Sequence, residues 1–253
     1  MIAMPGTAES NGTPESGDSA NSGDRLAQKT TPPRPVFEIV AALPVPYAVA
    51  PTLAFTLRVR DLAERSVYTI ALTTQINIEP ARRAYDDATR ESLVELFGAP
   101  ERWGSTARSL PWIKRDVLVP SFRGETTFEV QIACGYDLEI AAEKYFYSMP
   151  DGEVPLSFLF NGTIFYQGDD GRLQMVQIPW ECIAAFRLPV ATWRSMMGSY
   201  YGDAAWVRLG AETLDRLGQW KARRGLRTFD DCVAALLAES PEIPEAGGDP
   251  RDG

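Results

Sequence analysis

The sequence predicts an α+β fold, with a mainly antiparallel β-sheet or sandwich core followed by two or three C-terminal helices. Residues 36–180 contain runs in which apolar and polar side chains alternate, which is typical of strands with one buried face. Residues 188–238 instead place apolar side chains three and four positions apart, which is typical of helices that bury one face. No internal repeat is present.

The two ends of the chain differ in composition from its centre. Residues 1–35 are rich in Gly, Ser, Thr, Pro and Asn, and residues 239–253 are rich in Pro, Glu, Gly and Asp. Neither segment has enough large apolar side chains to offset the entropy cost of ordering. We therefore expect one α+β domain at 36–238, β-rich at 36–180 and helical at 188–238. A disordered N-terminal tail and a disordered acidic C-terminal tail would flank it.

The first half of this domain contains four strand patterns. A short pattern at 35–43 is followed by three prolines, which require an extended or turning connection. The alternation is clearest at 53–59 and 67–78, and the simplest arrangement for these two strands is an antiparallel pair joined by the turn at 61–65. A fourth pattern occupies 126–134.

The chain between the third and fourth patterns changes its period. We expect a short helix that is capped by Asp86 or Asp87 and ends at Gly98. The following segment, 98–120, contains two tryptophans and shows little periodicity. Long irregular connections are uncommon in compact domains and are often functional. The alternative is a lid that packs on the sheet through its tryptophans.

Two further segments contribute to the predicted core. Residues 137–147 fit either a helix or a strand, and we favour the strand because the flanking sequence resembles a hairpin. Residues 153–180 form two β-rich runs around a Gly-Asp-Asp-Gly turn, which predicts a hairpin. The first arm carries apolar residues on both faces, so we expect it to be covered on both sides.

Three helices are expected in the final third of the chain. Pro189 suits the first position of one helix. A second helix spans 210–224 and ends at Gly225 after several basic residues, which favour the negative end of a helix. Thr228 caps a third helix and forms a short capping box with Asp231.

Composition limits the chemistry that the chain can perform. It contains no histidine, which excludes Ser-His-Asp, Cys-His and zincin sites within this chain. The three cysteines are widely spaced and odd in number, which suits reduced, buried thiols in the cytosol. The formal net charge is -9, which favours neither nucleic acid nor an anionic membrane as a partner.

The expected location is the cytoplasm. The first residues lack the basic start and apolar run of a signal peptide, and no apolar run reaches the roughly 20 residues that a membrane span needs. We assign no metal, no cofactor and no catalytic residue from the sequence.

Two groups of charged residues are candidate sites. Asp137, Glu139 and Glu143 would share one face of a strand and could supply carboxylates for acid–base work, but we favour a solvated strand face, which normally carries such residues. A small basic cluster lies near the end of the second predicted helix, and it comprises Lys221, Arg223, Arg224 and Arg227. A capped helix end explains this cluster, and phosphate or nucleic-acid binding is the alternative.

Six tryptophans are the remaining candidates for binding, because tryptophan is enriched both in cores and in binding hot spots. Trp103 and Trp112 are the strongest candidates, since their segment is predicted to be irregular. The predicted partner-binding set is Trp103, Trp112, Arg102 and Trp180.

Six motifs in order along the chain carry a resemblance to a known family. They are Ile-Glu-Pro-Ala-Arg-Arg-Ala-Tyr (78–85), Leu-Phe-Gly-Ala-Pro-Glu-Arg-Trp (96–103), Tyr-Asp-Leu-Glu-Ile-Ala-Ala-Glu-Lys-Tyr (136–145), Asp-Gly-Glu-Val-Pro-Leu (151–156), Asn-Gly-Thr-Ile-Phe-Tyr (161–166) and Leu-Pro-Val-Ala-Thr-Trp-Arg (188–194). Together they resemble an actinobacterial domain-of-unknown-function family over about residues 36–238. The resemblance implies an association with gene clusters of uptake-type nickel–iron (NiFe) hydrogenases. It provides no catalytic residues to carry over.

A weaker resemblance is to the preprotein chaperone SecB. The C-terminal half of that chaperone is similar in the order of its elements: strands, Phe-Arg-Leu-Pro-Val, a helix, Trp-Val-Arg-Leu and a second helix. The insertion at 81–120 departs from this order.

These observations together predict a non-enzymatic, cytosolic accessory or chaperone-like binding protein. Its protein partner, by the family resemblance, would be a hydrogenase subunit or maturation factor. One alternative is a carboxylate-dependent enzyme. Another is a structural subunit of a larger complex, which would expose an apolar patch of roughly several hundred square ångströms.

Overall fold

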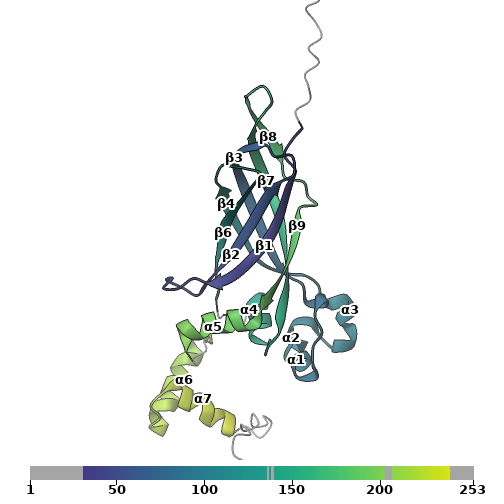
Figure 1. Ribbon diagram of the computed structural model, residues 1–253. Helices are drawn as coiled ribbons and strands as arrows, with labels where there is room; N and C mark the ends of the chain where they lie inside the picture. The colour runs from purple at the N-terminus through teal and green to yellow at the C-terminus, as the bar shows by residue number, and fades with distance from the viewer. Residues whose placement is uncertain (1–30, 136, 138–139, 203–206, 240–253) are drawn as a thin grey trace, which may run out of the picture.

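The structure, a computed structural model, describes residues 31–135, 137, 140–202 and 207–239, and contains two antiparallel sheets above a group of helices (Figure 1). The first sheet has the order β1 (Pro35–Pro44), β2 (Thr52–Asp61), β6 (Glu125–Ala133). The second has the order β4 (Leu110–Val119), β3 (Ser66–Ile78), β7 (Glu153–Gln167), β8 (Leu173–Gln177). β5 (Phe122–Arg123) also pairs with β3, and β9 (Ile183–Pro189) with β7. The predicted α+β class with a sandwich core is confirmed.

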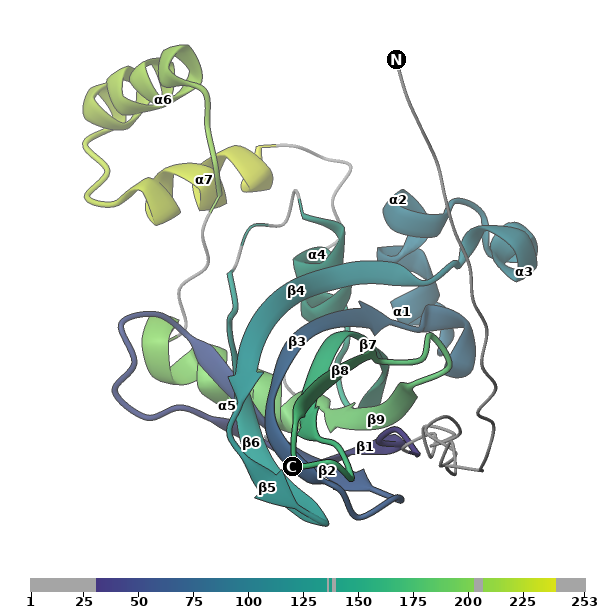
Figure 2. The ribbon, with the colours of Figure 1, turned by 90° about the horizontal axis from the view of Figure 1, so that it is seen from above.

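The sandwich core forms where the apolar faces of the two sheets meet. The view from above looks along the strands of both sheets (Figure 2). Phe37 of β1 stacks on Phe160 of β7 with ring centroids 4.1 Å apart. Phe55 of β2 meets Phe158 of β7 edge-on at 5.2 Å. Because these pairs bridge the sheets, burial of apolar area holds the two layers together.

The expected pairing of the strands at 53–59 and 67–78 is wrong. β2 pairs with β1 and β6, whereas β3 belongs to the other sheet. The turn between them crosses from one sheet to the other, and the buried Asp61 carboxylate fixes it by accepting from the backbone N–H groups of Arg34, Ala63 and Arg65. Both strands bury one apolar face, and a sandwich satisfies both by placing those faces opposite each other.

Short helices between β3 and β4 and after β6 form the base of the sandwich (Figure 1). They are the 3₁₀ turns η1 (Pro80–Arg82) and η2 (Pro100–Arg102) and the helices α1 (Asp87–Ser92), α2 (Val94–Phe97), α3 (Trp103–Thr106) and α4 (Ala141–Tyr147). Asp86 caps α1 by accepting from the Thr89 N–H at 2.7 Å. It is one of the two capping residues predicted from the sequence. The expected single helix is interrupted at Leu93.

The strand prediction for 137–147 is wrong, since residues Ala141–Tyr147 form α4. Residues 136, 138 and 139 lie outside the described part of the chain. The buried members of α4 are Ala142, Tyr145 and Phe146, which stand three and four positions apart. This helical spacing places all three side chains against the base of the core, whereas a strand would direct Tyr145 and Phe146 to opposite faces.

The prediction of an irregular segment at 98–120 is wrong for the second half of that segment, because β4 occupies Leu110–Val119. The register against β3 shifts beside Pro111 and Trp112, between the partners Ile76 and Asn77. This irregularity breaks the alternation from which a strand is recognised.

The hairpin predicted at 153–180 is present, with β7 and β8 on either side of the Gly-Asp-Asp-Gly turn. Its first arm is buried on the inner face, but the outer face is covered only in part: Ser157 is buried, Leu159 is half-buried and Asn161 is exposed. β9 was not predicted from the sequence.

The three C-terminal helices are α5 (Val190–Tyr201), α6 (Ala211–Arg224) and α7 (Phe229–Ala238). α5 lies against the sandwich, where the Tyr200 hydroxyl donates to the Ala48 carbonyl at 2.6 Å. α6 ends at Gly225 in the left-handed conformation, and Thr228 and Asp231 form the predicted capping box at the start of α7. Across the described residues, no helix has the length and apolar character needed to cross a membrane.

Candidate binding site at the base of the sandwich

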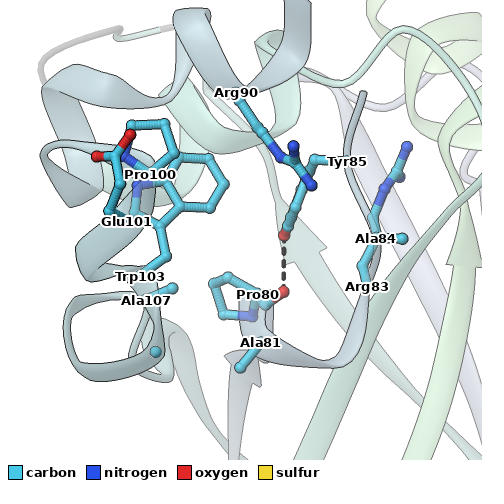
Figure 3. A pocket seen from close by; sticks show the side chains of 11 residues that line it. Pro80, Ala81, Arg83, Ala84, Tyr85, Arg90, Pro100, Glu101, Trp103 and Ala107 are labelled. Carbon is cyan, nitrogen blue, oxygen red and sulfur yellow. Dashed lines mark hydrogen bonds between the residues drawn. The ribbon is translucent and has the colours of Figure 1, made fainter. Parts of the chain in front are cut away.

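A cavity of about 530 Å³ opens between η1 and the helices α1 and α3 (Figure 3). It is lined by Pro80, Ala81, Arg83, Ala84, Tyr85, Arg90, Pro100, Glu101, Trp103, Gly104 and Ala107. The site arises because Glu79-Pro80 ends β3 and the chain turns away from the sheet before it returns as β4. Most of the lining is apolar, and the charged groups come from two arginines and one glutamate.

A chain of two hydrogen bonds fixes Tyr85 in the cavity wall. The Tyr85 hydroxyl donates to the Pro80 carbonyl at 2.8 Å and lies 2.6 Å from the Tyr145 hydroxyl of α4. Since a carbonyl only accepts, the single Tyr85 proton is used on Pro80, and Tyr145 must donate to Tyr85. Burial raises the pKa of both hydroxyls, and donation to Tyr85 raises that of Tyr145 further. Both tyrosines therefore stay neutral at physiological pH.

Trp103 forms the facing wall of the cavity (Figure 3). Its indole N–H donates to the Gly98 carbonyl at 2.8 Å, and its ring meets those of Tyr85 and Phe97 edge-on, each at 5.5 Å. One hydrogen bond and two ring contacts thus hold the indole in place, and the part that faces the cavity is a rigid apolar surface. Rigid aromatic walls lose little conformational entropy when they bind a partner.

Two arginines flank this aromatic surface. Arg83 donates to the carbonyls of Asp151 and Glu153 at 2.8 and 3.1 Å, so it connects η1 to the start of β7. Arg90 is more exposed and forms an ion pair with Asp87 at 3.2 Å on the same helix. An exposed pair of this kind is weak, so the Arg90 guanidinium is available to an approaching carboxylate or carbonyl.

The four predicted partner-binding residues do not come together in one site. Trp103 lines the cavity, and Arg102, the last residue of η2, is exposed beside it in the chain. Trp112 is half-buried in β4, where its ring lies 6.3 Å from Phe55 and 4.7 Å from Phe146. Trp112 therefore connects the sandwich core to α4, in the way that a packed lid residue would.

Trp180 lies elsewhere, in the connection between β8 and β9, and is 82% exposed. It borders a shallow hollow of about 300 Å³ on the outer face of the second sheet, where Thr73, Gln75 and Asn161 supply polar groups. Of the other tryptophans, Trp193 is buried and Trp206 lies outside the described residues.

The carboxylates considered for acid–base work do not line the cavity. Glu143 accepts from the backbone N–H groups of Asp137 and Gly135 and so holds the loop before α4. Burial raises the pKa of Glu143, and these two hydrogen bonds oppose the rise. Glu139 lies outside the described residues. In the part of the chain that the structure describes, no three His, Cys, Asp or Glu side chains are grouped as metal ligands.

The thiols are placed as the sequence analysis expected in two of three cases: Cys134 and Cys232 are buried and Cys182 is half-buried. Burial raises the pKa of Cys134 to about 12 and also raises that of Cys182. Neither thiol is activated as a nucleophile.

Most of the residues that form the cavity were not predicted from the sequence, above all Tyr85, Arg83 and Arg90. A local signal for Tyr85 and Arg83 was present: Pro80, two residues after a buried strand, is followed within five residues by two arginines and a tyrosine. The partner of Tyr85, Tyr145, was not recognisable because its segment was assigned to a strand.

The fold and this cavity define a β-sandwich protein whose helical base contains an apolar cavity flanked by two arginines. The chain belongs to the family described as "Family of unknown function (DUF6084)", whose model matches residues 33–245. No curated protein matches the sequence.

The solved structures that match this chain are distant from it. The CARDB domain of the PF1109 protein from Pyrococcus furiosus, solved in complex with di-metal ions, has 11% identity and a TM-score of 0.26 over 62% of this chain and 92% of that chain. The putative ApaA protein from Bordetella pertussis has 12% identity and a TM-score of 0.23 over 63% of this chain and 95% of that chain. A β-glucosidase from Kluyveromyces marxianus has 7% identity and a TM-score of 0.22 over 61% of this chain and 15% of that chain. Likeness at this level carries no argument about function.

Proposed function

We propose that the protein is a non-enzymatic, cytoplasmic accessory factor that binds a client protein, in the manner of a chaperone, through the cavity beside Trp103. The observation that carries the proposal is the character of this cavity: a rigid apolar wall with arginines at its rim. The polar groups of Tyr85 and Arg83 in its lining already form hydrogen bonds to backbone carbonyls of this chain. Such a surface suits recognition of apolar side chains from another protein.

The client we propose is a hydrogenase subunit or a maturation factor of a NiFe-hydrogenase. This part of the proposal comes from the sequence motifs that resemble the actinobacterial family. Two of those motifs, 78–85 and 96–103, contribute residues to the cavity. The net charge of -9 does not favour nucleic acid as the partner.

Gly104 provides a sharp test, because it lines the cavity and a Cβ added there meets no atom within 4 Å. A Gly104→Leu substitution would fill part of the cavity without disturbing its walls. Gly104→Ala is the matched control, since it adds the same Cβ and leaves most of the volume free.

The experiment is affinity capture of the tagged full-length protein from its native host, followed by mass spectrometry. We expect hydrogenase subunits or maturation factors with the wild type and the Gly104→Ala variant, and their loss with Gly104→Leu. Capture of the same partners by all three proteins would remove the cavity from the proposal. Absence of any hydrogenase-related protein would remove the client.

A further inference from the structure

The structure contains a second groove, on the C-terminal helical hairpin, that the proposed function does not use. We infer that the groove between α6 and α7 binds an acidic amphipathic peptide segment of a partner protein. It has a volume of about 500 Å³ and a floor formed by Leu217, Trp220 and Leu236. The remaining lining residues are Thr213, Arg216, Gln219 and Arg223.

The apolar floor is not covered by the hairpin itself. No residue of α6 is buried, and Cys232 is the only buried residue of α7. Leu236 is 40% exposed, and Leu217 and Trp220 are half-buried. Two helices of this length are marginal by themselves in water and gain most of their stability from packing of an apolar face. A partner that covers the floor would supply that packing.

The charges around the floor define the chemistry of the partner. Arg216 and Arg223 stand seven positions apart on α6 and therefore lie on one face of the helix, two turns from each other. Neither guanidinium has an ion pair or a hydrogen bond within the part of the chain that the structure describes. The lining contains no acidic side chain. A carboxylate on the partner would find an unopposed guanidinium at each end of the floor.

Two other members of the basic cluster noted in the sequence, Lys221 and Arg224, differ from Arg223 in this respect. Lys221 lies over the ring of Phe229, and Arg224 stacks on Trp220 at 4.5 Å and pairs with Glu239. These contacts place Arg224 and Lys221 in the structure of the hairpin. Arg216 and Arg223 at the rim have no contact of this kind among the described residues, in a chain whose net charge is -9.

A peptide segment fits these observations better than a small anion does. A small anion would engage one arginine and leave the apolar floor exposed, whereas an amphipathic helix places apolar side chains on the floor and acidic ones at both rims. Because the rim pairs would be exposed, each would contribute less to the affinity than the apolar floor does, and together they would set the orientation and the rate of association.

The test is selection from a phage-displayed library of random peptides of about 16 residues, a length sufficient for a marginal helix, against the immobilised full-length protein. We expect enriched peptides with acidic residues flanking leucine-like residues at helical spacing. Selection of peptides without an acidic bias, or no enrichment at all, would overturn the inference.

Three single charge reversals refine the test by fluorescence anisotropy with the best selected peptide. Arg216→Glu and Arg223→Glu should each weaken binding by about fivefold or more. Arg227→Glu is the matched control, because it makes the same charge change outside the groove, and it should leave affinity unchanged. Leu236→Gln should weaken binding without changing its salt dependence. Equal effects of all three reversals would show a non-specific attraction and contradict the inference.

Sedimentation velocity of the same proteins identifies the competing occupant. If the wild type forms a dimer that Arg216→Glu disrupts, a second copy of this chain covers the groove and the inference is overturned. A wild type that remains monomeric while it binds the acidic peptide agrees with it. Gly104→Leu should bind the peptide as well as the wild type does, so this result is independent of the proposed function.

Discussion

The hydroxyl pair of Tyr85 and Tyr145 predicts an asymmetry between two substitutions that remove the same atom type. In Tyr85→Phe, the Tyr145 hydroxyl loses its acceptor, and because Tyr145 is fully buried it meets no water. In Tyr145→Phe, Tyr85 still donates to the Pro80 carbonyl and loses only an interaction that it accepted. A buried donor left without a partner costs more than a lost hydrogen bond does.

The magnitude follows from the number of groups left without a partner. Tyr85→Phe removes two hydrogen bonds and leaves one buried hydroxyl without a partner, which should lower the free energy of unfolding by about 2–3 kcal/mol. Tyr145→Phe removes one hydrogen bond and leaves no donor without a partner, so the expected loss is about 0.5–1 kcal/mol. In the double variant the unpaired Tyr145 hydroxyl is absent, and the protein should be more stable than Tyr85→Phe alone.

The assay is thermal unfolding followed by circular dichroism, with urea unfolding as a second measure of the free energy. For a folded body of about 200 residues, the expected fall in Tm is about 4–12 °C for Tyr85→Phe and less than about 4 °C for Tyr145→Phe. Equal losses in the two single variants would refute the assignment of Tyr145 as the donor. Additive losses in the double variant would show that an unpaired Tyr145 hydroxyl does not destabilise Tyr85→Phe.

Three other predictions concern pH, backbone and thiols. The raised pKa of Tyr145 means that its stabilising contribution is complete below the unfolded-state value of about 10 and is lost as the pH rises above it, so Tm should fall less steeply above pH 10 in Tyr145→Phe than in the wild type. Gly162→Ala should destabilise the protein by more than about 3 kcal/mol, because φ is +142° and the new Cβ would lie 2.0 Å from a carbonyl oxygen of β3. Gly198→Ala, in the exposed interior of α5 with no atom near its Cβ, should instead stabilise it by about 0.5–1 kcal/mol, and chemical unfolding measures both. Iodoacetamide at neutral pH should leave Cys134 and Cys182 unmodified in the native protein and label both in urea, as mass spectrometry would show, because burial raises both pKa values; rapid native labelling of Cys134 would contradict its burial.

The sequence predicted the elements whose stabilising signals are local. The alternation in β2 and β3 reflects one face against the core, and the caps at Gly225 and Thr228 depend on residues within a few positions of the helix ends. The pairing of β2 with β6 was not predictable, because it depends on which sheet the chain enters after the Asp61 turn. That choice is made by contacts between residues far apart in the chain.

The errors have the same origin. α4 fits both a strand and a helix until the base of the core selects Ala142, Tyr145 and Phe146 as the buried set. β4 lost its alternation at the bulge beside Pro111 and Trp112. The cavity is formed by residues from η1, α1 and α3, and its key hydrogen bond reaches to α4, so only Trp103 could be identified in advance.

Hydrogenase activity in the native host tests most directly whether the cavity beside Trp103 serves an accessory role for a hydrogenase. The gene would be deleted and replaced by the wild type, Gly104→Ala or Gly104→Leu at equal protein levels, which immunoblotting would check. We expect that activity is lost on deletion, restored by the wild type and Gly104→Ala, and not restored by Gly104→Leu. Unchanged hydrogenase activity in the deletion strain would contradict it.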